Sequence, residues 1–194
     1  MTTELVQPST ESRLTYRKAS IEEFWALPES MLPVEYINGE IIMAPSPIVA
    51  HQTILGNIYF ALRTFVEDKK SGRMYCSPLE VELPTGDVVQ PDAFFLTNEE
   101  AALAAPASRV KGVPSFVVEI LSPGSVKHDA ITKRNLYELN GVREYWIVDP
   151  ETKTVSQLIL HEGHYALTEV PEADTIKSTV LKGFDCAVAQ FFTL

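Results

Sequence analysis

The segment SFVVEILS, residues 115–122, constrains the fold more than any other stretch of the chain. It is almost entirely apolar, and a strand of this kind is covered on both faces, as in the sheets of α/β proteins. Helical periodicity of apolar residues lies on both sides of it in the sequence. These features predict an α/β domain with this strand at the centre of its sheet.

The order of the other elements is consistent with this class. Asn38-Gly39 between two β-rich runs is a strong hairpin signal, and apolar residues at helical spacing mark a long amphipathic helix at 48–70. In chain order we expect a short helix at 20–28, a β-hairpin around 38–39, the helix at 48–70, strands at 74–83, 88–96 and 115–122, a helix at 129–139, a strand at 143–149 and a C-terminal β-meander.

Domain organisation follows from the same pattern. We expect a flexible N-terminus at 1–19 and one domain at 20–194, with its core at about 48–150. The alanine-rich stretch 98–112 is interpreted as a surface connection between strands. Trp25 and Trp146 fall on apolar stretches and are both predicted to be core residues.

Composition limits the possible functions. The chain has 194 residues and a formal net charge of −10, which argues against a broad basic surface for nucleic acid. It does not exclude an enzyme with clustered cations or with an acidic site that binds metal. Cys76 and Cys186 are far apart and lack metal-ligand spacing, so we expect reduced thiols in a cytoplasmic protein. No secretory signal or membrane span is predicted.

The stretch VQPDAFFL, residues 89–96, places a carboxylate where a strand is expected. Pro91 removes a ladder hydrogen bond, and aspartate is among the poorest strand formers. We therefore expect the strand to end or bend at Pro91, with Asp92 exposed to a neighbouring strand.

Glu119 lies in the middle of the apolar central strand, on the same face as Val117 and Leu121. An ionised carboxylate there is costly unless it is paired or binds metal. A buried salt bridge would explain Glu119 alone. If Asp92 points the same way, however, two anions about 4 Å apart repel by roughly 4 kcal/mol. A hard divalent cation with carboxylate and water ligands would remove that repulsion.

Lys133 lies on the helix that follows the central strand, and two interpretations of it stay open. It is four residues after Asp129, so it can form an ordinary ion pair on the helix surface. Alternatively, the helix packs across the strand and directs the Lys133 ammonium at the carboxylate pair.

These segments resemble a known family. The sequences QPD, VVEILSP and HDAITKRNLYELNGVREYWIVDP, together with the upstream VEYINGEIIMAPSP block, are similar to the restriction-endonuclease-like (Uma-type) proteins of the PD-(D/E)XK nuclease superfamily. The resemblance spans about residues 20–160. It implies a restriction-endonuclease-like core in the order αβββαβ, with a mixed central sheet flanked by helices, an N-terminal hairpin and a C-terminal meander.

The resemblance also implies site residues. Asp92 and Glu119 match the metal-binding acids, and Lys133 matches a lysine that the family carries on the helix, because the usual superfamily position holds Leu121. The lesser matches are Glu35, Glu40, His51 and Tyr137. The implied activity is Mg²⁺-dependent (or Mn²⁺-dependent) hydrolysis of DNA phosphodiester bonds, with DNA as partner and a homodimer if both strands are cut.

Alternatives remain. His51 at a helix start is more often a surface or capping residue than a metal or phosphate contact. Ser122, Ser125, His128 and Asp129 supply the residue types of a hydrolytic triad, but consecutive loop residues seldom converge on one point. The acidic net charge favours a second hypothesis, a catalytically silent binding module with the nuclease fold. A hydrolase of another phosphate ester would use the same residues.

Overall fold

The computed structural model describes residues 14–28, 32–104, 109–122, 124–126 and 128–193. The elements in chain order are β1 (Thr15–Lys18), α1 (Ile21–Trp25), β2 (Val34–Ile37), β3 (Glu40–Met43), α2 (Val49–Lys69), β4 (Gly72–Cys76), β5 (Val81–Glu82), β6 (Val88–Val89), β7 (Ala93–Thr97), α3 (Asn98–Ala104), β8 (Val110–Lys111), β9 (Phe116–Ile120), η1 (His128–Lys133), α4 (Arg134–Asn140), β10 (Glu144–Asp149), β11 (Thr154–His161), β12 (His164–Pro171), β13 (Thr175–Lys177), β14 (Asp185–Ala187) and η2 (Val188–Phe192).

Two six-stranded sheets organise the molecule. The central sheet has the order β12-β11-β10-β9-β7-β4, and the N-terminal sheet has the order β1-β3-β2-β6-β5-β8. In the central sheet β9 is parallel to β10 and antiparallel to β7, so the sheet is mixed. This is the predicted α/β class, with the restriction-endonuclease-like core and the N-terminal hairpin in place.

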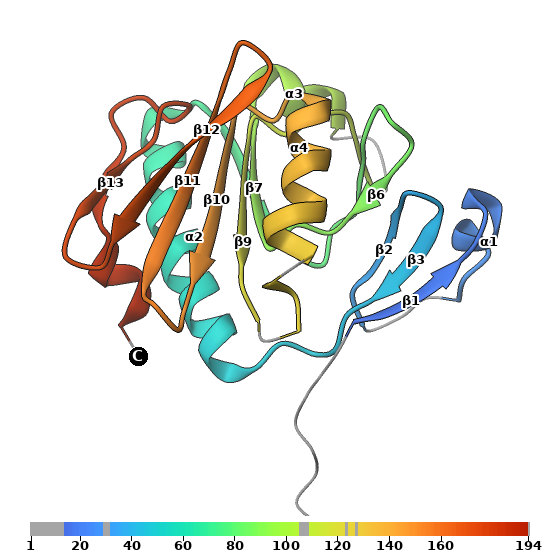
Figure 1. Cartoon of the computed structure of the whole chain (residues 1–194). Helices are drawn as coiled ribbons and strands as arrows, with labels where there is room; N and C mark the ends of the chain where they lie inside the picture. Colours follow the sequence, from blue (N-terminus) through green and yellow to red (C-terminus); the bar gives the residue numbers. More distant parts are fainter. Residues whose placement is uncertain (1–13, 29–31, 105–108, 123, 127, 194) are drawn as a thin grey trace, which may run out of the picture.

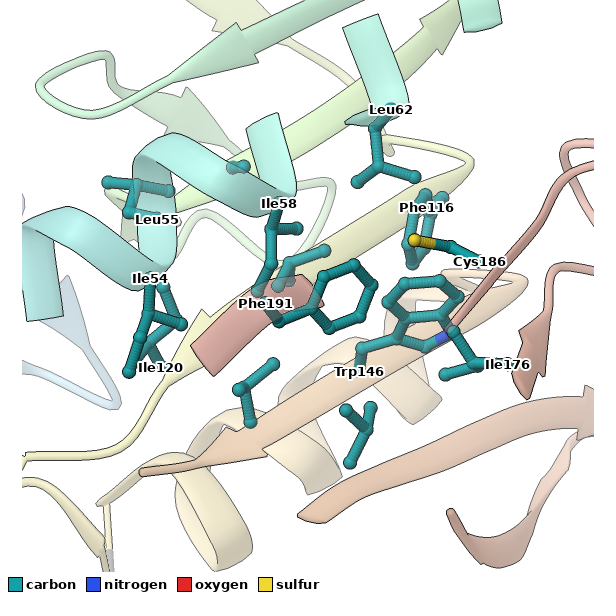
Figure 2. Packing of buried hydrophobic residues seen from close by; sticks show 14 of the residues in the cluster. Ile54, Leu55, Ile58, Leu62, Phe116, Ile120, Trp146, Ile176, Cys186 and Phe191 are labelled. Carbon is teal, nitrogen blue, oxygen red and sulfur yellow. The ribbon is translucent and has the colours of Figure 1, made fainter. Parts of the chain in front are cut away.

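Helices α2 and α4 cover opposite faces of the central sheet (Figure 1). On one face, Ile54, Ile58 and Leu62 recur at helical spacing along α2 and pack against Phe116 and Trp146, as Figure 2 shows. The other face packs Val117, Tyr145 and Ile147 against Leu136 and Tyr137 of α4. The apolar run of β9 is therefore buried on both sides, as its composition predicted.

The predicted strand at 74–83 is wrong in its continuity, whereas the predicted end or bend of the strand 88–96 at Pro91 is confirmed. The predicted strand 74–83 divides into β4 and β5, which belong to different sheets, and the predicted strand 88–96 divides in the same way into β6 and β7. Pro78 and Pro91 lie in the two gaps, where the absence of a backbone N–H ends the ladder. The chain thus crosses from one sheet to the other immediately before Asp92.

Four further expectations need correction. Part of the N-terminus that was expected to be flexible forms β1, which pairs with β3; residues 1–13 lie outside the described part. The connection at 98–112 contains the helix α3. The predicted helix 129–139 begins as the π-helical turn η1 and continues as α4. Trp25 is 39% exposed, because Phe24 takes the buried position of the short helix α1.

Within the part of the chain that the structure describes, no helix combines the length and the apolar character needed to cross a membrane. The C-terminal residues return to the central sheet, where η2 packs against α2. Glu144 of β10 is fully buried beneath this segment and accepts hydrogen bonds from the backbone N–H groups of Thr179 and Val180, both at 2.9 Å.

Candidate active site

Asp92 and Glu119 lie side by side on adjacent strands. Asp92 directly precedes β7, whose first residue Ala93 pairs with Val118 of β9. The backbone N–H of Asp92 donates to Oε2 of Glu119 at 3.3 Å, and the backbone N–H of Ile120 donates to Oδ2 of Asp92 at 2.8 Å. Each acidic residue is thus held by the backbone of the other strand.

Lys133 projects from η1 into the same place. Its Nζ lies 2.8 Å from Oε1 of Glu119, 2.8 Å from Oε1 of Glu35 and 3.8 Å from Oδ1 of Asp129. The side chain is buried, so the interpretation as a helix-surface pair is wrong. The structure instead has the arrangement in which the helix directs its ammonium at the acidic residues.

Glu119 receives a further donor on the same oxygen as Lys133. The hydroxyl of Tyr137, on α4, donates to Oε1 of Glu119 at 2.8 Å. Tyr137 is completely buried between α4 and the central sheet. Two donors from one helical segment therefore fix the rotamer of Glu119.

Glu35 brings the N-terminal sheet into the site. From β2 its Oε1 accepts the backbone N–H of Gln90 at 2.8 Å, while its Oε2 lies 3.0 Å from Nε2 of His128. Together with Lys133 these contacts satisfy both oxygens of a buried carboxylate.

His51 lies in the first turn of α2 and faces Asp92. Its Nε2 is 3.1 Å from Oδ2 of Asp92, and the residue is buried, so the surface or capping interpretation of His51 is wrong. Nδ1 of His51 and Nδ1 of His128 have no hydrogen-bond partner among the described residues.

Burial and charge shift the acid–base properties of these groups in different directions. Burial raises the pKa of Glu35, but Lys133 and His128 outweigh it and lower the pKa to about 2. Burial raises the pKa of Glu119 well above its ordinary value, and Asp92 and Asp129 add to this against the opposing effect of Lys133. The carboxylates around Lys133 overcome its burial and raise its pKa, so Lys133 stays cationic. Glu35 and Glu119, which both contact the Lys133 ammonium, therefore have very different pKa values.

A cavity of about 120 Å³ opens onto this cluster. Asp92 lines it with its side chain 17% exposed. Apolar residues of the segment between β3 and α2, namely Ala44, Pro45, Pro47 and Ile48, form one wall. The other polar or charged side chains that line the cavity are Glu35, Ser46, His51, Gln52, Ser77, Gln90, Glu119, Ser122, Ser125, His128, Asp129 and Lys133.

Of the residues proposed from the sequence, Asp92, Glu119, Lys133, Glu35, His51 and Tyr137 come together here. Glu40 does not, because it lies beside the hairpin turn at the start of β3, opposite Ile37. His128 was considered for a triad only, and Asp129 for a triad and for a surface ion pair with Lys133. Both line the cavity with Ser122 and Ser125, but His128 points to Glu35, and the Asp129–Lys133 pair at 3.8 Å is buried.

The donor set at Asp92 and Glu119 suits a magnesium ion. Mg²⁺ is commonly bound by one or two carboxylates and keeps several waters, and Asp92 and Glu119 offer two carboxylates beside a cavity. Among the described residues, no group of three or more histidine, cysteine, aspartate or glutamate side chains is arranged to hold a metal ion. An ion held by the two carboxylates of Asp92 and Glu119 would keep most of its ligands as water.

Comparisons with known proteins give one matching family model and a similar solved structure. A family model described as "Uma2: Putative restriction endonuclease" matches residues 21–189. A crystal structure from Anabaena variabilis, described as "a putative nuclease belonging to DUF820", is similar with a TM-score of 0.77 and 20% sequence identity. The similarity covers 89% of this chain and 96% of that chain. A search of curated proteins found no match.

Proposed function

The chain belongs to the Uma2 family, and from this premise we propose that it is a Mg²⁺-dependent endonuclease that hydrolyses DNA phosphodiester bonds. The observation that carries the proposal is the reciprocal pairing of Asp92 and Glu119 across two strands, beside a cavity and next to a buried lysine. Two carboxylates placed this way are suited to holding a cation against a phosphate.

Asp92 and Glu119 would hold the metal. When bound there, Mg²⁺ supplies Lewis-acid polarisation of the phosphate and a water of lowered pKa. Asp92 keeps its orientation through the backbone N–H of Ile120 and through His51. Glu119 keeps its orientation through Tyr137 and the backbone N–H of Asp92.

Lys133 would orient the attacking water and offset the negative charge that develops on the phosphate oxygens. Its ammonium is 2.8 Å from Glu119 and remains charged. Glu35 holds the ammonium from the opposite sheet at the same distance. In this role Glu35 is a positioning residue, because it acts through Lys133.

The test is cleavage of supercoiled plasmid and of linear DNA with Mg²⁺, Mn²⁺ or EDTA. We expect metal-dependent cleavage by the wild-type chain and a loss of at least about 100-fold for Asp92→Asn, Glu119→Gln and Lys133→Met. The ratio of nicked to linear plasmid shows whether one or both strands are cut. Glu169→Ala is the matched control, because Glu169 is an exposed carboxylate on β12, and it should cleave like the wild type.

Two outcomes would contradict the proposal. Cleavage that persists in EDTA, or that the folded Glu119→Gln variant retains, would remove the metal site from the mechanism. Absence of both cleavage and Mg²⁺ binding by the wild type would favour the alternative, a binding module that keeps the nuclease fold. The net charge of −10 is the observation that favours this alternative, because it weakens binding of a polyanion.

A further inference from the structure

A second cavity lies next to the candidate active site. Its volume is about 210 Å³, and it is open to solvent and lies between α1 and the N-terminal sheet. Gln90 lines both cavities and is two residues before Asp92 in the sequence. The residues lining the second cavity are Phe24, Trp25, Leu27, Pro28, Leu32, Val34, Glu80, Gln90 and Arg109.

One wall of this cavity is a stacked pair. The guanidinium carbon of Arg109 lies 3.7 Å from the centre of the Trp25 ring, and the Phe24 ring meets Trp25 edge-on with 4.7 Å between ring centres. Trp25 is well exposed for a tryptophan, although Phe24 beside it is buried. An exposed indole braced by a cation and a second ring is a preformed platform for a flat, aromatic ligand.

Gln90, which lines this cavity, carries a side-chain acceptor without a partner among the described residues. Its Oε1 is buried and has no hydrogen-bond partner in the described part of the molecule, whereas its backbone N–H is fixed by Glu35. A buried acceptor without a donor reduces stability. A ligand with an N–H group in the cavity would supply the missing donor.

The position limits what this ligand is. Residues 90 and 92 are at most about 7 Å apart along the chain, so a group held beside Gln90 is about one nucleotide away from a phosphate at Asp92. A base can enter such a cavity only when it is unstacked and unpaired. Stacking on aromatic rings and contacts with arginine are how proteins hold unpaired bases.

We propose that this cavity binds one unpaired base of the nucleic-acid strand, adjacent to the phosphate in the candidate active site. The base stacks against Trp25 and Arg109, and its exocyclic amino group donates to Oε1 of Gln90. Cytosine, adenine and guanine carry such an exocyclic amino group, whereas uracil and thymine offer only a ring N–H at the base edge. The position of the phosphate in this inference rests on the proposed nuclease function. The substrate is therefore a single-stranded or locally opened nucleic acid.

The test is equilibrium binding in EDTA, where the proposed cleavage cannot occur. Fluorescence anisotropy of 5′-labelled ten-residue deoxycytidine and deoxyuridine oligonucleotides compares two ligands that differ at the base edge. We expect the deoxycytidine strand to bind about 10-fold more tightly than the deoxyuridine strand. It should also bind about 10-fold more tightly than the duplex that it forms with its complementary strand. Trp25→Ala should weaken binding of both strands by about 10-fold, and Gln90→Leu should abolish the difference between them.

Matched variants keep the result interpretable. Phe60→Ala removes another exposed aromatic side chain, on α2, and should bind like the wild type. Trp25→Phe retains a stacking surface and should recover most of the affinity if Trp25→Ala is impaired in folding. Equal affinity for the two strands, or an unaltered affinity of folded Trp25→Ala, would overturn the inference.

The outcomes also separate this inference from the proposed function. If the wild type cleaves DNA with Mg²⁺ but shows no base preference, the proposal of a base-binding cavity is wrong and the proposed nuclease activity is supported. If the affinity difference between the two strands depends on Trp25 and Gln90 but no DNA is cleaved, the base-binding cavity is supported and the proposed nuclease activity is wrong.

Discussion

Lys133 and Glu35 belong to different layers of the molecule, yet Nζ of Lys133 lies 2.8 Å from Oε1 of Glu35. Glu35 is on β2 of the N-terminal sheet, whereas Lys133 ends the turn η1, which continues into the helix that covers the central sheet. Both side chains are buried. This ion pair therefore links the two sheets at the site where the candidate catalytic residues meet.

Replacing Lys133 should destabilise the fold as well as abolish activity. Lys133→Met leaves Glu35 and Glu119 buried without their shared cation, and loss of one partner of a buried pair costs about 3–5 kcal/mol. Urea unfolding at neutral pH measures this loss. Lys153→Met is the matched control, because Lys153 forms an exposed ion pair with Glu172 at 3.0 Å and should cost at most about 1 kcal/mol. Equal effects of the two substitutions would contradict the buried pair.

Glu35 should make stability depend on pH in the acid range. Its pKa is about 2 in the folded chain and 4.5 as the ordinary value. Because the folded-state pKa is the lower one, the stabilisation is fully present above about pH 4.5 and is lost as the pH falls towards 2. A difference of this size corresponds to on the order of 3 kcal/mol.

The measurement for this prediction is urea unfolding at intervals from pH 6 to pH 2.5 for the wild type and for Glu35→Gln. The variant lacks the titrating group, so the stability difference between the two proteins should shrink steadily below pH 4.5. A difference that stays constant over the whole range would show that Glu35 is not held as a carboxylate by Lys133 and His128.

Glu144 should be essential for attachment of the C-terminal segment. Its carboxylate is fully buried and accepts hydrogen bonds from Trp146, Gln157, Ser178, Thr179 and Val180 at 2.7–3.0 Å. Glu144→Ala leaves these donors unsatisfied, and we expect a loss of at least about 3 kcal/mol. Glu169→Ala removes an exposed carboxylate that accepts from Ser156 and should change stability by less than about 1 kcal/mol. Thermal unfolding of both variants distinguishes the two cases.

Two glycines should respond in opposite directions to alanine. A Cβ on Gly72 would overlap the carbonyl oxygen of Leu96 and lie 2.5 Å from Cε2 of Phe95, so Gly72→Ala should cost about 1–3 kcal/mol. A Cβ on Gly56, within α2, would meet no atom within 4 Å, so Gly56→Ala should stabilise the chain by about 0.5–1 kcal/mol. Urea unfolding tests both, and a shared sign would contradict the close approach of Gly72 to Leu96 and Phe95.

Local pattern was sufficient to predict much of the architecture. The spacing of Ile54, Ile58 and Leu62 predicted α2 almost to its ends, and the apolar run around Glu119 predicted a strand covered on both faces. The convergence of Lys133 on Asp92 and Glu119 was one of two interpretations that the residues left open, and the family resemblance favoured it. Their catalytic roles stay predictions.

Contacts between segments that are far apart in the sequence could not be derived from local sequence patterns. Glu35 contacts both Gln90 and His128, and the proximity of these three segments depends on how the two sheets pack. Periodicity describes only the face of a single element. Trp25 was misplaced for a related reason. A five-residue helix has room for one buried aromatic residue, and tertiary packing selected Phe24.

The division of one expected strand into β6 and β7 has a consequence for assembly. The three residues from Gln90 to Asp92 connect the two sheets, so the candidate active site lies where the two sheets meet. The central sheet and its helix carry Asp92, Glu119 and Lys133, whereas Glu35 comes from the N-terminal sheet, so Lys133 should gain its second carboxylate partner only when the two layers dock.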